Sequence, residues 1–97
     1  MSVTVTLDFK AKPDNAQKLY DTLAAILGDT RAFEGNEGVT VHRDLSDETL
    51  IFLYEHWTAI ENQQAYMNWR QERGDLDTLV SMLAEPPVIR SWENSPI

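Results

Sequence analysis

Apolar and polar residues alternate along the first segment of the chain. From Val3 to Phe9 every second residue is apolar, and the residues between are Thr, Thr and Asp. A period of two is typical of a strand that buries one face. Lys12-Pro13-Asp14 ends this strand, because proline fixes φ and lacks a backbone N–H. Gln17 follows Asp14 by three residues, and this spacing indicates a capping box at the start of a helix.

The pattern then changes from a period of two to helical spacing. One stripe carries the apolar residues of the expected helix: Ala16, Leu19, Tyr20, Leu23, Ile26 and Leu27. Gly28 is expected to end this helix. A connector over 29–38 contains two glycines, and strands are predicted over 39–45 and 49–57 with a hairpin turn at 46–48.

The second half of the chain predicts two more helices and a strand. Thr58 and Glu61 form a second capping-box pattern, so a helix is expected over 59–73, with Gly74 closing it. Apolar residues at i, i+3, i+4 and i+7 predict a third helix over 76–83. Pro86-Pro87 ends it, and a last strand is expected over 88–92. The predicted order is β-α-β-β-α-α-β.

This order is a split βαβ pattern, typical of a ferredoxin-like α+β fold with a four-stranded antiparallel sheet and helices on one face. The 97 residues allow one domain. Residues 50–54 are apolar or aromatic at every position, so both faces of this strand are apolar. Helices cover only one of these faces. We therefore expect a second copy of the sheet to cover the other, giving a homodimer with two-fold symmetry.

Composition excludes several classes of protein. The net charge of −8 opposes binding to nucleic acid or to an acidic membrane surface. The absence of cysteine excludes disulfides, thiolate catalysis and cysteine metal sites. No segment reads as a signal peptide or a membrane span, so a cytoplasmic location is expected.

Two short motifs resemble a known family. His42-Arg43-Asp44 and, after a short turn, Tyr54-Glu55-His56-Trp57 are similar to the antibiotic biosynthesis monooxygenase family, whose members are described as dimeric α/β barrels. The Glu-x-Trp step at the end of the third strand is the most recognisable feature. Lys12-Pro13 before the first helix and Gly38 before the second strand also fit. The resemblance implies a dimeric α/β barrel for this chain.

The resemblance also implies a chemistry. The family's monooxygenase branch oxidises polycyclic phenols or quinols without flavin, heme or metal, so no cofactor and no metal ligands are expected. Such a reaction needs a dry aromatic pocket, a proton acceptor and donors to developing negative oxygen. Many members of the family carry a His on the second helix, where Tyr66 and Met67 stand here. The heme-degrading branch also needs an Asn on the first strand, which this chain lacks. Heme degradation is therefore disfavoured.

Three residues are the catalytic candidates. Trp57 could wall the pocket and offer its indole N–H to oxygen or substrate, or it could only pack between sheet and helices. Glu55 shares a strand face with Trp57, and burial would raise its pKa and suit it as a base. Pairing with Arg43 or Arg90 is the favoured alternative for Glu55. Tyr66, in place of the family's His, is the third candidate.

The remaining pocket candidates are Trp69, three residues after Tyr66, and Leu53 and Leu7 on the buried faces of their strands. Aromatic residues at helical spacing can also be simple core residues. Arg70 and Arg73 are expected to be surface charges.

His56 points away from Trp57 toward the expected dimer face. His42 is expected to face the same way, although a shift of one residue in strand register would reverse it. No spacing of these histidines demands a metal site.

The resemblance implies a cofactor-independent monooxygenase, or a related small oxidoreductase, that acts on a small aromatic phenol- or quinone-like molecule. The alternative is a non-catalytic dimer that binds a small hydrophobic ligand or serves in stress response. The expected partners are a second copy of the chain and a small aromatic molecule. The sequence does not identify the substrate.

Overall fold

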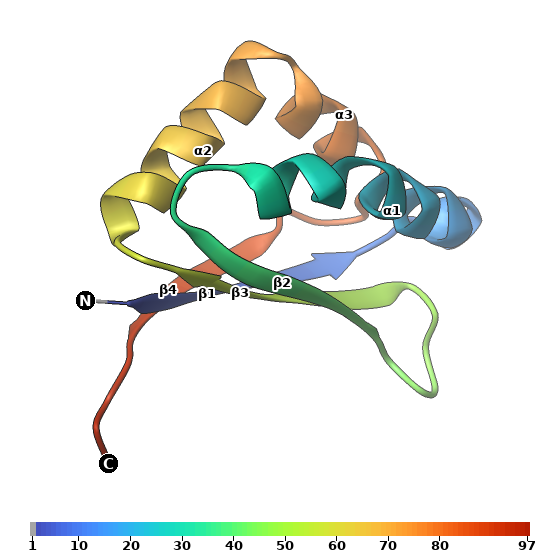
Figure 1. Cartoon of the computed structure of the whole chain (residues 1–97). Helices are drawn as coiled ribbons and strands as arrows, with labels where there is room; N and C mark the ends of the chain where they lie inside the picture. Colours follow the sequence, from blue (N-terminus) through green and yellow to red (C-terminus); the bar gives the residue numbers. More distant parts are fainter. Residues whose placement is uncertain (1) are drawn as a thin grey trace.

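The computed structural model describes residues 2–97 and contains one antiparallel sheet with strand order β2-β3-β1-β4. All three α-helices lie on the same side of this sheet, and the chain's last residues extend below the other side (Figure 1). The predicted ferredoxin-like α+β arrangement is confirmed. The elements are β1 (Val3–Lys10), the 3₁₀ turn η1 (Pro13–Asn15), α1 (Ala16–Ala32), β2 (Asn36–Arg43), β3 (Leu50–Trp57), α2 (Ile60–Glu72), α3 (Asp75–Ser81) and β4 (Val88–Glu93).

The core lies between the sheet and the helices. Strand β3 is central, and its residues alternate strictly, with 51, 53, 55 and 57 buried against the helices. Leu53 pairs with Leu7 of β1 on one side and with Val41 of β2 on the other. Leu19, Leu23 and Leu27 of α1 are buried against this surface. Each fully buried leucine stabilises the fold by about 1.5–3 kcal/mol.

Several predicted element boundaries are wrong. Helix α1 continues past Gly28 to Ala32, because Thr30 in its last turn is fully buried and hydrogen-bonded to Tyr66. A glycine inside a helix costs only about 1 kcal/mol relative to alanine, which such tertiary contacts offset. Strand β2 begins at Asn36, three residues earlier than expected, and a bulge between Asn36 and Gly38 accommodates the start.

Neither predicted capping box forms. The residue before α1 is Asn15, and a 3₁₀ turn that begins at Pro13 leads into the helix. Gln17 instead donates to Asp21 along α1. At α2 the capping position is Ala59, without a side-chain hydrogen bond. Both helices therefore start without a side-chain cap.

The face of the sheet away from the helices carries a row of aromatic rings. His42, Phe52, Tyr54 and His56 follow one another with ring centroids 6.0, 6.4 and 4.7 Å apart. His56 also lies 3.3 Å from the hydroxyl oxygen of Thr4 on β1. The predicted orientation of both histidines, opposite to Trp57, is confirmed. In residues 2–97 no helix is long and apolar enough to cross a membrane.

A buried carboxyl beside a candidate ligand cavity

A cavity of about 120 Å³ lies between the sheet and the three helices. Three polar side chains reach it, Glu55, Tyr66 and Arg70, and the other side chains around it are apolar. The apolar walls come from each of the surrounding elements, among them Leu7 (β1), Leu23 (α1), Leu53 (β3), Met67 (α2), Leu79 (α3) and Ile89 (β4). The predicted placement of Leu7, Leu53, Glu55 and Tyr66 around one pocket therefore agrees with this geometry.

Glu55 is the acidic group of the cavity, and its side chain is almost completely buried. Its Oε1 accepts a hydrogen bond of 3.0 Å from the indole Nε1 of Trp57. Burial raises the pKa of this carboxyl above 4.5, and the hydrogen bond from Trp57 only partly opposes the increase. No arginine pairs with Glu55 in the described chain. The expected pairing with Arg43 or Arg90 is wrong.

The two arginines have other positions. The Arg43 guanidinium lies 3.8 Å from the ring centroid of Tyr20 on α1, where it is held by a cation–π contact. Arg90 is exposed on β4 and stands opposite Thr6 of β1. Because Thr6 belongs to the uncovered face of the sheet, Arg90 does so as well, away from Glu55. Within residues 2–97, only one oxygen of the Glu55 carboxyl accepts a hydrogen bond, the one from Trp57.

The raised pKa of Glu55 predicts a specific pH dependence of stability. A carboxyl that is harder to ionise when folded binds its proton more tightly in the folded state. The stability that the protonated carboxyl contributes is therefore complete below about pH 4.5. It is lost as pH rises through the higher pKa that Glu55 has in the folded protein. We expect Glu55→Gln to gain stability relative to wild type as pH rises from 4 to 8, as measured by urea denaturation. A difference in stability between the two proteins that stays constant from pH 4 to pH 8 would contradict the raised pKa of Glu55.

Tyr66 and Arg70 are joined in a buried hydrogen-bond network. The Tyr66 hydroxyl accepts from Nε of Arg70 at 2.8 Å and lies 2.6 Å from the hydroxyl of Thr30. Arg70 also donates to the carbonyl of Ile26 on α1 and to the carboxylate of Asp75 at the start of α3. Burial alone would lower the pKa of the guanidinium, but these hydrogen bonds outweigh it, so the pKa is raised. One charged side chain therefore links all three helices.

Three sequence-based expectations need correction here. Trp57 is fully buried but does not line the cavity, and its N–H is already bonded to Glu55. Trp69 also stands behind the wall, packed on Phe33 with centroids 5.5 Å apart and flanked by two arginine side chains. Arg70 is not a surface charge, because only 2% of its side chain is exposed. Arg73 is a surface charge as expected, because 53% of its side chain is exposed.

Arg70, Thr30 and Met67 are the residues at this site that sequence reasoning missed. Arg70 follows Tyr66 by four residues, so the two side chains had to lie on one face of α2. That spacing could have suggested their contact. Met67 stands beside Tyr66 as a wall residue. No local pattern marks Thr30, whose partners are 36 and 40 residues away.

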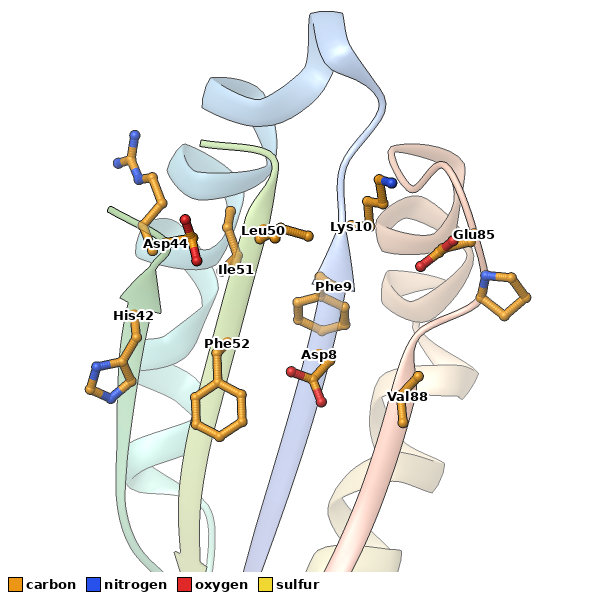
Figure 2. Close-up of a pocket in the computed structure, with 12 residues that line it drawn as sticks. Asp8, Phe9, Lys10, His42, Asp44, Leu50, Ile51, Phe52, Glu85 and Val88 are labelled. Carbon is orange, nitrogen blue, oxygen red and sulfur yellow. The ribbon is translucent and has the colours of Figure 1, made fainter. Parts of the chain in front are cut away.

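A second, wider hollow of about 350 Å³ lies at the end of the uncovered sheet face. Figure 2 shows His42, Phe52, Asp8 and Val88 side by side there, each on a different strand. Lys10 and Glu85 lie farther along the same hollow. Within residues 2–97 no three acidic or histidine side chains are grouped to hold a metal ion. The hollow therefore belongs to the sheet face, separate from the buried carboxyl.

Comparison with known proteins gives a family match. The family model described as "Antibiotic biosynthesis monooxygenase" matches residues 2–74. A conserved protein from Methanosarcina mazei Go1 has a similar structure, with a TM-score of 0.89 at 15% identity over 98% of this chain and 94% of the other. A candidate antibiotic biosynthesis monooxygenase from Deinococcus radiodurans has a TM-score of 0.83 at 21% identity over 100% and 95%. A comparison with proteins of curated function finds no match. At these identities the structural likeness establishes the fold.

Proposed function

Because the chain belongs to the antibiotic biosynthesis monooxygenase family, we propose that it is an oxidoreductase that inserts one atom of O₂ into a small phenol- or quinol-like aromatic molecule. The observation that supports this most is the apolar cavity that presents one buried carboxyl, Glu55. An oxidisable ring fits the apolar walls. Its hydroxyl fits the only carboxylate among the residues around the cavity.

The reaction balances without an external reductant. A phenol and O₂ give a quinone and water, and the ring supplies all the electrons that O₂ takes up. Loss of the hydroxyl proton produces a phenolate, which passes an electron to O₂, and a ring carbon then bonds to oxygen. When that carbon loses its proton, the O–O bond breaks, a carbonyl remains on the ring and the second oxygen leaves as water.

Glu55 is the residue that takes the phenol proton in this proposal. A general base works best when its pKa lies near the operating pH, and burial raises the pKa of Glu55 in this direction. Trp57 acts through Glu55 as a positioning residue, because its N–H fixes one carboxyl oxygen and leaves the other free. Tyr66 closes the cavity opposite the sheet, and Arg70 and Thr30 fix the position of its hydroxyl. Trp69 supports that wall from behind.

Oxygen uptake with a panel of simple phenols and hydroquinones tests the proposal. We expect uptake that depends on the protein and falls as pH drops through the pKa of Glu55. Glu55→Gln keeps the shape of the side chain, removes the base and should slow uptake by about 10²–10⁴-fold. Trp57→Phe should bind substrate normally and turn over more slowly. Uptake by Glu55→Gln at the wild-type rate would remove Glu55 from the mechanism.

The alternative function is non-catalytic binding of a small hydrophobic ligand. In that case the same compounds would quench tryptophan fluorescence saturably, but no protein-dependent oxygen uptake would follow.

Heme degradation is further disfavoured by size, since a porphyrin of four pyrrole rings greatly exceeds a cavity of about 120 Å³. Tyr66 is also already engaged by Arg70.

We further propose that the protein acts as a homodimer through the uncovered sheet face. Tyr54 is 40% exposed and Trp92 is 48% exposed on this face, and Phe52 lies between His42 and Tyr54 in the aromatic row. Large aromatic side chains are enriched at protein interfaces and are costly to leave in water. A second copy of the same face would cover them symmetrically.

A further inference from the structure

The size of the cavity limits what can enter it. Pockets for drug-sized ligands usually measure about 300–1,000 Å³, whereas this cavity measures about 120 Å³. An apolar protein cavity of about 150 Å³ holds one benzene molecule. The space between Leu23, Leu53 and Met67 therefore matches one aromatic ring with small substituents. Two or more fused rings would need the walls to move.

The polarity of the cavity differs between its two ends. Glu55 and Tyr66 are 3% and 6% exposed and form the inner end. Val80 of α3 and Ile89 of β4 also line the cavity, yet they are 50% and 43% exposed. The cavity thus reaches the surface between α3 and β4, where its walls are apolar. A ligand that enters there meets the carboxyl last.

The free atom at the inner end is the second oxygen of Glu55. Oε1 accepts from Trp57, while no protein donor is directed at Oε2 within residues 2–97. The only buried side-chain polar atom without a partner among these residues is Nδ2 of Asn36, so Oε2 is not sealed in the core and reaches the cavity. The Tyr66 hydroxyl, in contrast, is occupied by Arg70 and Thr30. One hydroxyl donor on the ligand would satisfy Glu55.

We propose that this cavity selects single-ring phenols over fused-ring phenols and binds them with the hydroxyl directed inward to Glu55, entry being between α3 and β4. This inference rests on the proposed function and specifies its substrate class. The volume of the cavity selects the ligand by size. The oxygen of Glu55 that does not accept from Trp57 orients the ligand's hydroxyl group.

Binding measured without oxygen tests the size limit. Anaerobic calorimetric titration of the wild-type protein should give a dissociation constant for phenol at least tenfold lower than that for 1-naphthol. Leu23→Ala enlarges the cavity and should reduce this ratio to about threefold or less. Leu19→Ala is the matched control, because Leu19 is a buried leucine one turn away on α1 that does not line the cavity. It should leave the ratio unchanged. If Leu23→Ala does not fold, Met67→Ala enlarges the cavity at a wall residue that is only partly buried.

The orientation is tested with toluene, which replaces the hydroxyl of phenol by a methyl group. Wild type should bind phenol at least tenfold more tightly than toluene. Glu55→Met, which removes the acceptor at similar length, should bring the two affinities close together. Equal affinity of wild type for phenol and toluene would overturn the orientation.

Other outcomes test the size limit or separate this inference from the proposed function. Binding of 1-naphthol as tight as phenol, or no binding of either compound, overturns the size limit. Anaerobic binding of phenol with the expected ratios, but without oxygen uptake when air is admitted, keeps the inference and contradicts the proposed function. Protein-dependent oxidation of fused-ring phenols alone keeps the function and overturns the inference.

Discussion

Replacement of Arg70 by alanine should lower the free energy of unfolding by about 3–5 kcal/mol, because it removes a buried cation that donates to three acceptors. The substitution leaves the Asp75 carboxylate, the Tyr66 hydroxyl and the Ile26 carbonyl without the donor that now joins them. A chain of this size has a total stability of about 5–15 kcal/mol. For a domain of 60–100 residues each kcal/mol shifts Tm by about 4–8 °C. We therefore expect Tm to fall by at least about 12 °C in a thermal scan followed by circular dichroism.

Arg73→Ala is the matched control for this experiment. Arg73 follows the last residue of α2 and pairs with the same Asp75 oxygen as Arg70, at 3.1 Å, but more than half of its side chain is exposed. Exposed ion pairs contribute only about 0–1 kcal/mol. The control should therefore shift Tm by less than about 8 °C. Equal Tm shifts in Arg70→Ala and Arg73→Ala would show that the burial of Arg70 does not determine how much it contributes to stability.

Phe52→Asp should convert the proposed dimer to a folded monomer. Phe52 lies in the aromatic row on the uncovered face, so the substitution places two unpaired charges in the proposed interface, one from each copy. Loss of about 1.5–3 kcal/mol of apolar burial in each copy corresponds to a dissociation constant raised by about 10²–10⁴-fold. Light scattering should report a mass near the 11.1 kDa of one chain, against twice that for wild type. Circular dichroism should show the helices retained.

Two other substitutions separate assembly from folding. Leu53→Asp places the charge on the opposite, helix-facing side of the same strand, and should unfold the protein because Leu53 is only 3% exposed. Leu45→Asp introduces the same charge at a fully exposed leucine between β2 and β3, and should change neither mass nor folding. A wild-type protein that is monomeric at micromolar concentration would contradict the proposed interface.

The fold was largely predictable from the sequence, because β1 has a period of two and β3 begins with an apolar run, patterns that few other structures tolerate. Helix ends were less predictable. Gly28 was a reasonable stop by local rules, yet α1 continues because Thr30 bonds to Tyr66 on another helix. The two capping-box patterns also failed, and at the first of them Gln17 bonds to Asp21 within α1. Both local sequence patterns and tertiary contacts determine where a helix ends, and only the local patterns can be recognised in the sequence.

The candidate site was predictable in part. Strand alternation correctly placed Glu55 and Leu53 toward the helices, next to Tyr66. It could not show that the Trp57 N–H would be taken by Glu55, since that depends on the rotamers of both side chains. It also missed the burial of Arg70, because an arginine can be buried only when distant groups satisfy its donors. The volume of the cavity results from packing as a whole.

Turnover under ¹⁸O₂ is the most direct test of the claim that this cavity supports monooxygenation. Mass spectrometry of the product, reduced at once to the hydroquinone so that carbonyl oxygen does not exchange with water, should show one ¹⁸O atom per ring. The second ¹⁸O atom should appear in water, and Glu55→Gln should form the labelled product at least about 100 times more slowly. A product without ¹⁸O, formed with one hydrogen peroxide per ring oxidised, would show simple oxidation and contradict the account.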